Sequence, residues 1–154
     1  KILLAKPEDS KLLLQFFIDN DNVPQDFFKK RIDYYIDNHF ITLVKDNEKI
    51  IGCLFFQAKE NPFLGVGEFE CIHIHSEYQR KGIGLKMIKQ AIEFARDYFA
   101  KRKIKLWSLY LFTRSNNLSA QKIYEKIGFR PANTIGKIYR KDQPEELVMT
   151  RFFG

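Results

Sequence analysis

The sequence is poor in cysteine, with Cys53 and Cys71 its only two among 154 residues. Two cysteines cannot build the disulfide framework of a small secreted domain, and a buried thiol behaves as a small hydrophobic side chain. No apolar run approaches the ~20 residues that a membrane span needs. The apolar stretch at the start of the sequence is too short for a signal peptide. We therefore expect a cytoplasmic protein with no membrane partner.

Repeats, low-complexity tracts and linkers are also absent from the sequence, so nothing in it divides the chain. A length of 154 residues suits one compact domain, and we expect residues 1–154 to form it. Charged residues make up 29% and hydrophobic residues 45%, which excludes disorder as the main description. The net charge of +7 is compatible with nucleic acid, anionic lipid or a phosphate-rich ligand, although a solvated lysine-rich surface is the commonest cause.

The hydrophobic patterns predict an α/β protein. Strands are expected where β-branched and aromatic residues gather, and helices where apolar residues recur three and four apart. The expected strands cover residues 2–5, 40–45, 49–57, 66–75, 106–112, 129–138 and 146–152, and the expected helices cover residues 7–18, 26–38, 82–103 and 117–127. Strands and helices alternate in the second half, which predicts a mixed, centrally parallel sheet of about seven strands flanked by about four helices.

The most informative segment is Gln79-Arg80-Lys81-Gly82-Ile83-Gly84, between a predicted strand and the strongest predicted helix. Amides at a helix start have no partner within the helix and carry the positive end of its dipole, so they attract phosphate. Alternate glycines remove the Cβ atoms that would keep a pyrophosphate away. A strand-to-helix turn that merely needs glycine would show the same pattern, so this segment alone decides nothing.

A second pattern, Asn-x-x-Ala-x-x-x-Tyr-x-x-x-Gly-Phe, covers residues 117–129. Asn117, Ala120 and Tyr124 are spaced to share one face of a helix, where Ala makes room and the other two present polar atoms. An amphipathic helix with a partly buried tyrosine would also explain this block if it stood alone.

Together the two patterns resemble the GNAT superfamily of acyl-CoA N-acyltransferases. Gln-x-x-Gly-x-Gly after a strand is similar to that family's coenzyme A pyrophosphate loop, and residues 72–84 look like its fourth strand and loop. The block at 117–129 is similar to its later motif. The resemblance spans nearly the whole chain and is strongest from Phe69 to Phe129. Ser76 departs from the family pattern, in which proline is common.

The resemblance implies acetyl-CoA (coenzyme A) as co-substrate, no metal, and a set of contacts. The strand backbone at Ile72, His73 and Ile74 would pair with the pantetheine arm. Asn117 would bind near the pantetheine or phosphate end. Tyr124 would protonate the leaving thiolate, and an N–H near Ile74 would stabilise the oxyanion. The amides that would hold the pyrophosphate are those of Arg80, Lys81, Gly82, Ile83, Gly84 and Leu85.

The acceptor amine also needs a base, because a lysine-like amine with a pKa of about 10.4 is protonated at neutral pH. Glu68 and Glu70 are the candidates. Glu68 stands where the histone-acetylating branch of the family carries its carboxylate, and Glu70 is the fallback. Strict alternation would place both beside core residues with Ile72 and Ile74, a setting that suits a base. A bulge in the strand would exchange their faces, and a carboxylate at a sheet end in water is the plain structural alternative.

Two further groups have residue types that allow other roles. Cys71, His73 and His75 could hold zinc by type, but no fourth ligand is evident, so we expect no metal. His75 is an alternative proton carrier. The basic run at residues 101–105 complements the dipole of the preceding helix, and docking of an acidic partner is the weaker alternative.

The sequence therefore predicts an N-acetyltransferase that moves an acetyl group from acetyl-CoA to a primary amine by direct attack in a ternary complex. The acceptor is a small molecule or a protein amino group, and nucleic acid is not expected. The sequence leaves open whether the chain forms a homodimer. The alternative is a non-catalytic basic binding module, for nucleic acid or CoA sensing, on the same fold. Segments 19–37 and 131–146 are expected to form the acceptor side.

Overall fold

The computed structural model describes residues 1–21, 24–59, 61–136 and 141–154. The chain forms two compact units, one of Lys1–Gln57 with Cys71–Ala95 and the other of Ala58–Glu70 with Arg96–Gly154. The helix break predicted at residues 19–24 begins later than expected, because the first helix continues to Asp21; Asn22 and Val23 lie outside the described residues. Residue 138, the predicted end of a strand, also lies outside them.

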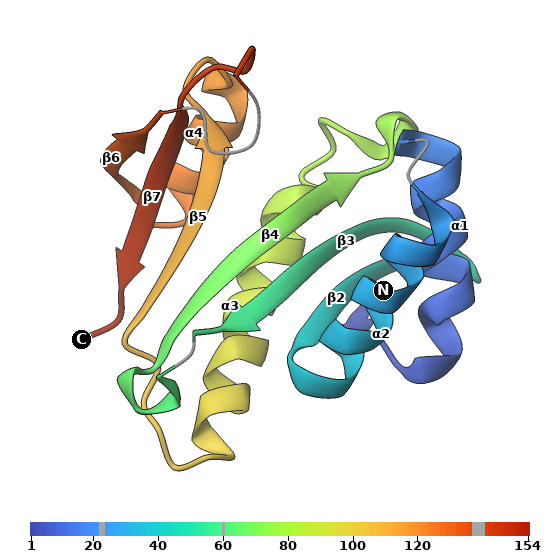
Figure 1. Ribbon diagram of the computed structural model, residues 1–154, viewed down its shortest axis with the longest axis horizontal. Coiled ribbons are helices and arrows are strands. Elements are labelled where there is room, and N and C mark those ends of the chain that lie inside the picture. Colours follow the sequence, from blue (N-terminus) through green and yellow to red (C-terminus); the bar gives the residue numbers. More distant parts are fainter. Residues whose placement is uncertain (22–23, 60, 137–140) are drawn as a thin grey trace. The chain divides into compact units, whose positions relative to one another are not determined.

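All the predicted helices and strands are present within the described ranges (Figure 1), and their ends differ by only a few residues from those expected. In the first unit lie β1 (Ile2–Leu4), η1 (Pro7–Asp9), α1 (Ser10–Asp21), α2 (Gln25–Asn38), β2 (Phe40–Asp46), β3 (Lys49–Ala58) and η3 (Ser76–Tyr78). In the second lie η2 (Pro62–Leu64), β5 (Ser108–Arg114), α4 (Leu118–Lys126), β6 (Arg130–Ile135) and β7 (Glu146–Phe152). Strand β4 (Val66–Ile74) and helix α3 (Ile83–Ala100) each contribute to both units. No helix in these ranges is both long and apolar enough to cross a bilayer.

The strands of the first unit run in the order β1-β2-β3-β4, and β1, β2 and β3 pair antiparallel. Asn47, between β2 and β3, is left-handed (φ 54°), as is typical of the tight turn that closes a hairpin. At the end of β4, the N–H of His75 donates to the carbonyl of Ile51 at 2.8 Å. The hairpin and the end of β4 therefore carry the chain into the turn before α3.

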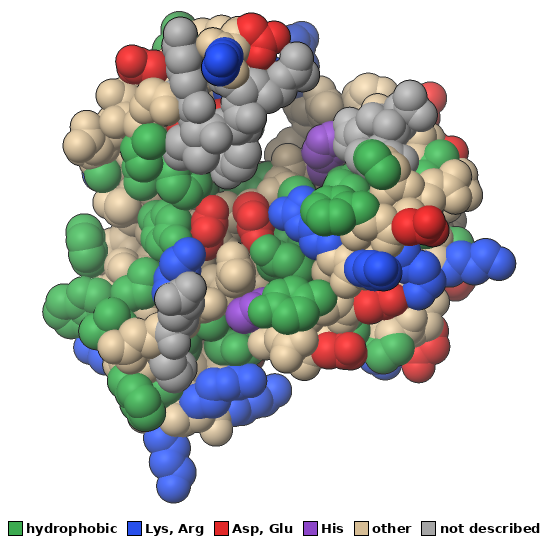
Figure 2. Space-filling view, viewed as in Figure 1, with side chains coloured by type: hydrophobic (Ala, Val, Ile, Leu, Met, Phe, Trp, Pro, Cys, Tyr) green, Lys and Arg blue, Asp and Glu red, His purple; other side chains and the backbone are tan. Residues whose placement is uncertain are grey.

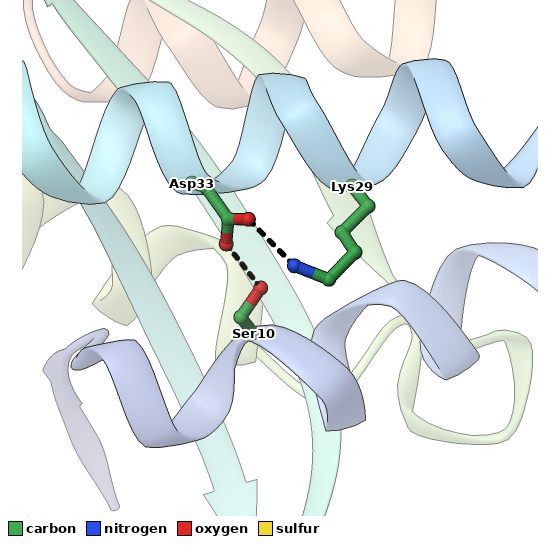
Figure 3. Close-up of polar contacts among 3 residues, drawn as sticks. All are labelled: Ser10, Lys29 and Asp33. Carbon is green, nitrogen blue, oxygen red and sulfur yellow. Dashed lines mark hydrogen bonds and ion pairs between the residues drawn. The ribbon is translucent and has the colours of Figure 1, made fainter.

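Helices α1 and α2 cover a core of buried apolar side chains in the first unit. A polar contact also joins them (Figure 3): Ser10 Oγ donates to Asp33 Oδ1 at 2.6 Å, and Lys29 Nζ pairs with Asp33 Oδ2 at 2.7 Å. The hydrogen bonds from Lys29 and Ser10 hold the pKa of Asp33 below its ordinary value. The acidic residues of this helix pair are thus partly used for packing.

The second unit contains the parallel pair of strands. β4 runs parallel to β5 from Val66 opposite Ser108 to Phe69 opposite Leu111, and β5, β7 and β6 follow with antiparallel pairing. The predicted mixed sheet is therefore confirmed, although most of its pairs are antiparallel. The fully buried side chains of this unit include Phe69, Leu109, Leu111, Phe129 and Met149.

Candidate active site

Strand β4 is interrupted at Cys71, whose φ of 49° is left-handed. A single left-handed residue inside a strand is typical of a β-bulge, which re-aims the side chains that follow it. The backbone therefore supports the bulge that the sequence left open, in place of strict alternation of Glu68 and Glu70 with Ile72 and Ile74. The two carboxylates precede the interruption and belong to the second unit, while Ile72 and Ile74 follow it and belong to the first.

The segment after β4 is tied to the end of that strand by side chains. Gln79 Nε2 donates to the carbonyl of Ile74 at 2.9 Å, and the N–H of Glu77 donates to His75 Nδ1 at 3.2 Å. The Tyr78 hydroxyl donates to Asp46 Oδ2 on the β2–β3 hairpin at 2.8 Å. These bonds fix the start of the loop that leads into α3.

The loop itself, residues 79–84, contains two left-handed residues, Arg80 (φ 60°) and Gly82 (φ 77°). Alternating left-handed and right-handed residues turn successive amides toward one concavity that suits an anion. The carbonyl of Gly82 accepts the N–H of Lys86 at 3.2 Å. The amides of Ile83, Gly84 and Leu85 precede this donor, so they have no acceptor within the helix.

The two glycines of the loop, Gly82 and Gly84, are under different structural constraints. Gly82 needs its positive φ, and a Cβ there would meet no atom within 4 Å. Gly84 has no positive φ, and a Cβ there would meet only Ile74 Cγ1 at 3.7 Å, an ordinary contact. The packing of the chain itself therefore does not require glycine at 84. A pyrophosphate approaching the amides would require it, so the loop residues fit coenzyme A.

Positive side chains lie beside this loop. Arg80 and Lys81 are exposed. Lys81 Nζ lies 5.5 Å from the centre of the Tyr78 ring, and Lys49 Nζ lies 6.0 Å from it. Three cations near the helix start raise the positive potential that the amides already create.

In the second unit, Tyr124 of α4 is only 8% exposed, and its ring lies edge-on to Phe129. Burial raises the pKa of Tyr124 to about 12, because the phenolate loses more hydration than the phenol does. The hydroxyl is therefore protonated at neutral pH and can donate a proton or a hydrogen bond.

Asn117 does not share the helical face of Tyr124 as the spacing predicts, because it is the N-cap of α4 and lies outside the helix (φ −88°, ψ 73°). Its Oδ1 accepts the N–H of Ala120 at 3.2 Å, which satisfies one of the first amides of the helix. The side chain is exposed, and its NH₂ group keeps two donors for a ligand.

Glu68 has two neighbours that the sequence analysis missed. Tyr110 lies directly opposite it in the β4–β5 register, with its hydroxyl 3.4 Å from Glu68 Oε1. Lys59 Nζ lies 3.7 Å from the same oxygen and 5.5 Å from the centre of the Tyr110 ring. Burial, together with the charge of Glu68, raises the pKa of Tyr110. The grouping of Tyr110 and Lys59 around Glu68 follows from the strand register. In the sequence, Tyr110 is marked only as a tyrosine within an apolar strand.

Glu68 itself is 9% exposed, and Glu70 Oε1 is buried. The exposed carboxylate at a sheet end, the structural alternative for these residues, therefore does not describe Glu68. The Tyr110 hydroxyl and the Lys59 ammonium group beside its carboxylate are both donors.

His73 of β4 and His75, which follows the strand, have structural neighbours. The His73 ring centre lies 6.0 Å and 6.3 Å from those of Phe17 and Phe16, and His75 caps the η3 turn. Among the residues that the structure describes, no three His, Cys, Asp or Glu side chains form a group that could hold a metal ion.

The loop between β4 and α3 has amides without a helical acceptor beside cations, which suits the phosphate of a carrier molecule, and the second unit holds a buried tyrosine that is protonated at neutral pH. The chain belongs to the acetyltransferase (GNAT) family, whose model matches residues 10–129.

One relative is an N-alpha-acetyltransferase from Saccharolobus solfataricus, which is 28% identical over 140 residues, covering 85% of this chain and 78% of the relative. Two solved structures have the same fold. A GNAT-family acetyltransferase from Streptococcus pneumoniae has a TM-score of 0.79 at 21% identity, with all of both chains covered. A spermidine N-acetyltransferase from Vibrio cholerae has a TM-score of 0.77 at 17% identity, covering 99% of this chain and 94% of the other.

These relationships confirm the predicted enzyme class. The chain is an acetyl-CoA-dependent N-acetyltransferase that transfers an acetyl group to an amine. The non-catalytic binding module is not favoured, because the family is one of acetyltransferases and the curated relative is an N-alpha-acetyltransferase.

The reason for glycine at 84 can be tested with two substitutions. Gly84→Ala should fold with its stability unchanged or raised by about 0.5 kcal/mol, since alanine is the better helix former. It should nevertheless bind CoA at least about tenfold more weakly, because the new methyl group occupies the phosphate space. Gly84→Glu should abolish the stabilisation of about 2.7 kcal/mol expected for the natural protein at 100 times the Kd of CoA. Thermal melts with and without CoA measure both.

Gly136→Ala is the matched control, because its φ, like that of Gly84, is not positive and a Cβ at Gly136 would meet no atom of the described residues within 4 Å. It should leave CoA affinity unchanged. Equal CoA affinity in the natural protein and in Gly84→Glu would contradict a pyrophosphate at this loop.

Proposed function

We propose that the chain transfers the acetyl group directly from acetyl-CoA to a primary amine in a ternary complex, with the whole of residues 1–154 acting as one catalytic domain. The observation that carries this proposal is Gly84, a glycine at a helix start that the surrounding protein does not require. Bound acetyl-CoA supplies the activated acyl group and a thiolate leaving group. Binding of the carrier and the proton transfers depend on side chains and backbone amides of this chain.

The proposed cofactor contacts follow the loop and the strand before it. The amides from Arg80 to Leu85 bind the pyrophosphate, supported by the left-handed Arg80 and Gly82. The backbone from Ile72 to Ile74 follows the interruption at Cys71 and pairs with the pantetheine amides. Asn117 caps α4 through Oδ1 and directs its NH₂ donors to the carrier.

The proposed acid is Tyr124. A thiolate leaving group gains from a nearby proton donor, and a tyrosine with a pKa of about 12 is fully protonated at working pH. The proposed base is Glu68, with Glu70 as the second candidate. Glu68 is buried beside Tyr110, so the pair can pass a proton along a short hydrogen-bonded path from the amine.

The acceptor that we propose is the α-amino group of a polypeptide, which the 28% identical N-alpha-acetyltransferase supports. An α-amino group has a pKa near 8, whereas a lysine or polyamine nitrogen has one above 10. Deprotonation at pH 7 therefore costs the α-amine about 1–1.5 kcal/mol, against about 4–5 kcal/mol for lysine. An α-amino acceptor consequently needs the base far less.

The compartment that we propose is the cytoplasm. Cys53 and Cys71 are both thiols, and neither belongs to a disulfide framework. Retained thiols are usual in a reducing compartment.

A thiol-release assay tests the function directly. Peptides with an open N-terminus should release CoA thiol from acetyl-CoA, and they should do so faster than the same peptides with a blocked N-terminus but an open lysine. Spermidine, amino acids and aminoglycosides complete the panel. Thiol release only with small amines would contradict the polypeptide acceptor, and no release with any amine would contradict the proposal as a whole.

For Tyr124, the change to phenylalanine keeps the ring and removes the proton donor. Tyr124→Phe should lower kcat by about 10²–10⁴-fold while CoA affinity stays unchanged, since the hydroxyl acts only as the thiolate leaves. Steady-state kinetics and CoA titration measure the two quantities. A kcat within threefold of the natural value would reduce Tyr124 to a packing residue.

The same variant checks the raised pKa of Tyr124. Below pH 10 the tyrosine is protonated in both the folded and the unfolded state, so it adds no pH dependence. Between pH 10 and about 12 only the unfolded state loses the proton, and the unfolding free energy should fall by up to about 1.4 kcal/mol per pH unit. In Tyr124→Phe the unfolding free energy should not show this contribution to its decrease above pH 10. Parallel urea titrations at pH 9 to 11 compare the two proteins.

For the base, Glu68→Gln should lower kcat/KM most at neutral pH, and a higher pH should rescue part of the loss as more acceptor arrives deprotonated. The loss should be larger with a lysine acceptor than with an α-amino acceptor. Glu70→Gln and the double variant separate the two carboxylates, and Glu48→Gln, an exposed hairpin carboxylate, controls for the charge change. If both single variants keep the natural acidic limb of the pH–rate profile, neither carboxylate is the base.

A further inference from the structure

The second unit exposes four large apolar side chains, which we call the tryptophan surface: Phe63, Leu64, Trp107 and Phe152. They are 84%, 57%, 51% and 67% exposed. Phe63 and Leu64 lie on the η2 turn, Trp107 lies just before β5, and Phe152 ends β7. Isolated exposed apolar residues are ordinary, but several together mark an interaction site.

Backbone contacts hold these segments together. The N–H of Trp107 donates to the carbonyl of Gly65, directly after the η2 turn, at 2.8 Å, and the N–H of Phe153 donates to the carbonyl of Trp107 at 2.9 Å. Ser108 lies opposite Phe152 in the β5–β7 pair. Gly65 is left-handed, and a Cβ there would lie only 2.0 Å from the carbonyl oxygen of Lys105. The turn and the start of β5 are therefore closely packed, and Phe63, Leu64 and Trp107 extend from segments whose backbones are joined.

Cations border the tryptophan surface. Lys101, Lys103 and Lys105 are exposed on the segment that leads to Trp107. The sequence has no acidic residue between Asp97 and Glu125. In Figure 2 hydrophobic and basic side chains gather at the lower left, where Figure 1 places the η2 turn and the segment before β5. These lysines belong to the basic run at residues 101–105, for which the sequence allows two roles: complementing the helix dipole or docking an acidic partner.

We propose that the tryptophan surface and its three lysines bind the surface of an anionic lipid bilayer. Tryptophan and phenylalanine are favoured at the membrane interface, and lysines beside them are attracted to acidic headgroups. The sequence predicts no membrane partner because no segment can span a bilayer. A surface contact needs no spanning segment.

Other occupants fit these features less well. A second copy of the chain docked by the same surface would bring its lysines against the first set, which costs energy. A peptide needs a groove or a sheet edge, whereas Phe63 and Leu64 project from a turn. The bases of a nucleic acid could stack on the aromatic rings, but the exposed aliphatic side chain of Leu64 offers no ring for stacking. A bilayer accepts protruding side chains without a preformed pocket.

The chain carries its own reporter, because Trp107 is the only tryptophan in the sequence. Vesicles of phosphatidylcholine with 30% phosphatidylserine should shift its emission to the blue and protect it from acrylamide. Brominated lipids should quench it. Vesicles of phosphatidylcholine alone should bind at least about tenfold more weakly, and 500 mM salt should reverse most of the binding to the acidic vesicles. The measurement uses the full chain and does not depend on catalysis.

Two variants separate the apolar and the ionic parts. Phe63→Ser with Leu64→Ser should lower vesicle affinity by about tenfold or more. Lys101→Glu with Lys103→Glu should abolish the preference for acidic lipid. The matched controls are Leu12→Ser with Phe27→Ser, exposed apolar residues of α1 and α2, and Lys122→Glu with Lys126→Glu on α4. Both controls should bind like the natural protein.

Three outcomes would overturn the proposal. The first is an emission spectrum of Trp107 that does not change with acidic vesicles. The second is a loss of binding that is equal in the matched control variants, which would indicate a general effect of charge or hydrophobicity. The third is a change at Trp107 produced by oligonucleotides, or by a rise in protein concentration, and not by vesicles; it would assign the surface to nucleic acid or to a second copy of the chain. Thermal melts confirm that every variant folds.

Discussion

The backbone of β4 changes conformation at Cys71, and the candidate residues on each side of Cys71 depend on that change. Before Cys71 the strand pairs in parallel with β5, which places Glu68 opposite Tyr110. After it the strand leads into a loop whose amides have no helical acceptor. One left-handed residue therefore separates a segment that presents carboxylates from a segment that presents backbone groups. A regular strand would place all these residues by strict alternation.

The ligand-binding role proposed for the glycine loop rests on how its glycines compare with Gly65. Gly65 and Gly82 have backbone conformations that favour glycine, and at Gly65 the neighbouring chain leaves no room for a side chain. Gly84 has neither constraint. A glycine that the fold does not need, placed at the positive end of a long helix, is explained by close approach of an anion.

The net charge of +7 is distributed over regions with different roles. Lys49, Arg80 and Lys81 lie near the loop proposed for pyrophosphate. The lysines of residues 101–105 lie beside exposed aromatic side chains instead, so the total charge does not report a single partner. A basic isoelectric point can in this way reflect two separate anionic ligands.

The order and type of the helices and strands follow from hydrophobic periodicity, which is local information, and so do the glycine loop and the block around Tyr124. The pairing of Glu68 with Tyr110 and Lys59, the capping role of Asn117 and the burial that raises the pKa of Tyr124 required the tertiary structure. Register, capping and burial depend on residues far apart in the chain, or on a single left-handed residue such as Cys71 that no residue pattern marks. The sequence by itself determined the family and the position of the loop proposed for pyrophosphate, whereas the surroundings of each proposed catalytic group were decided by which strands pair and at what register.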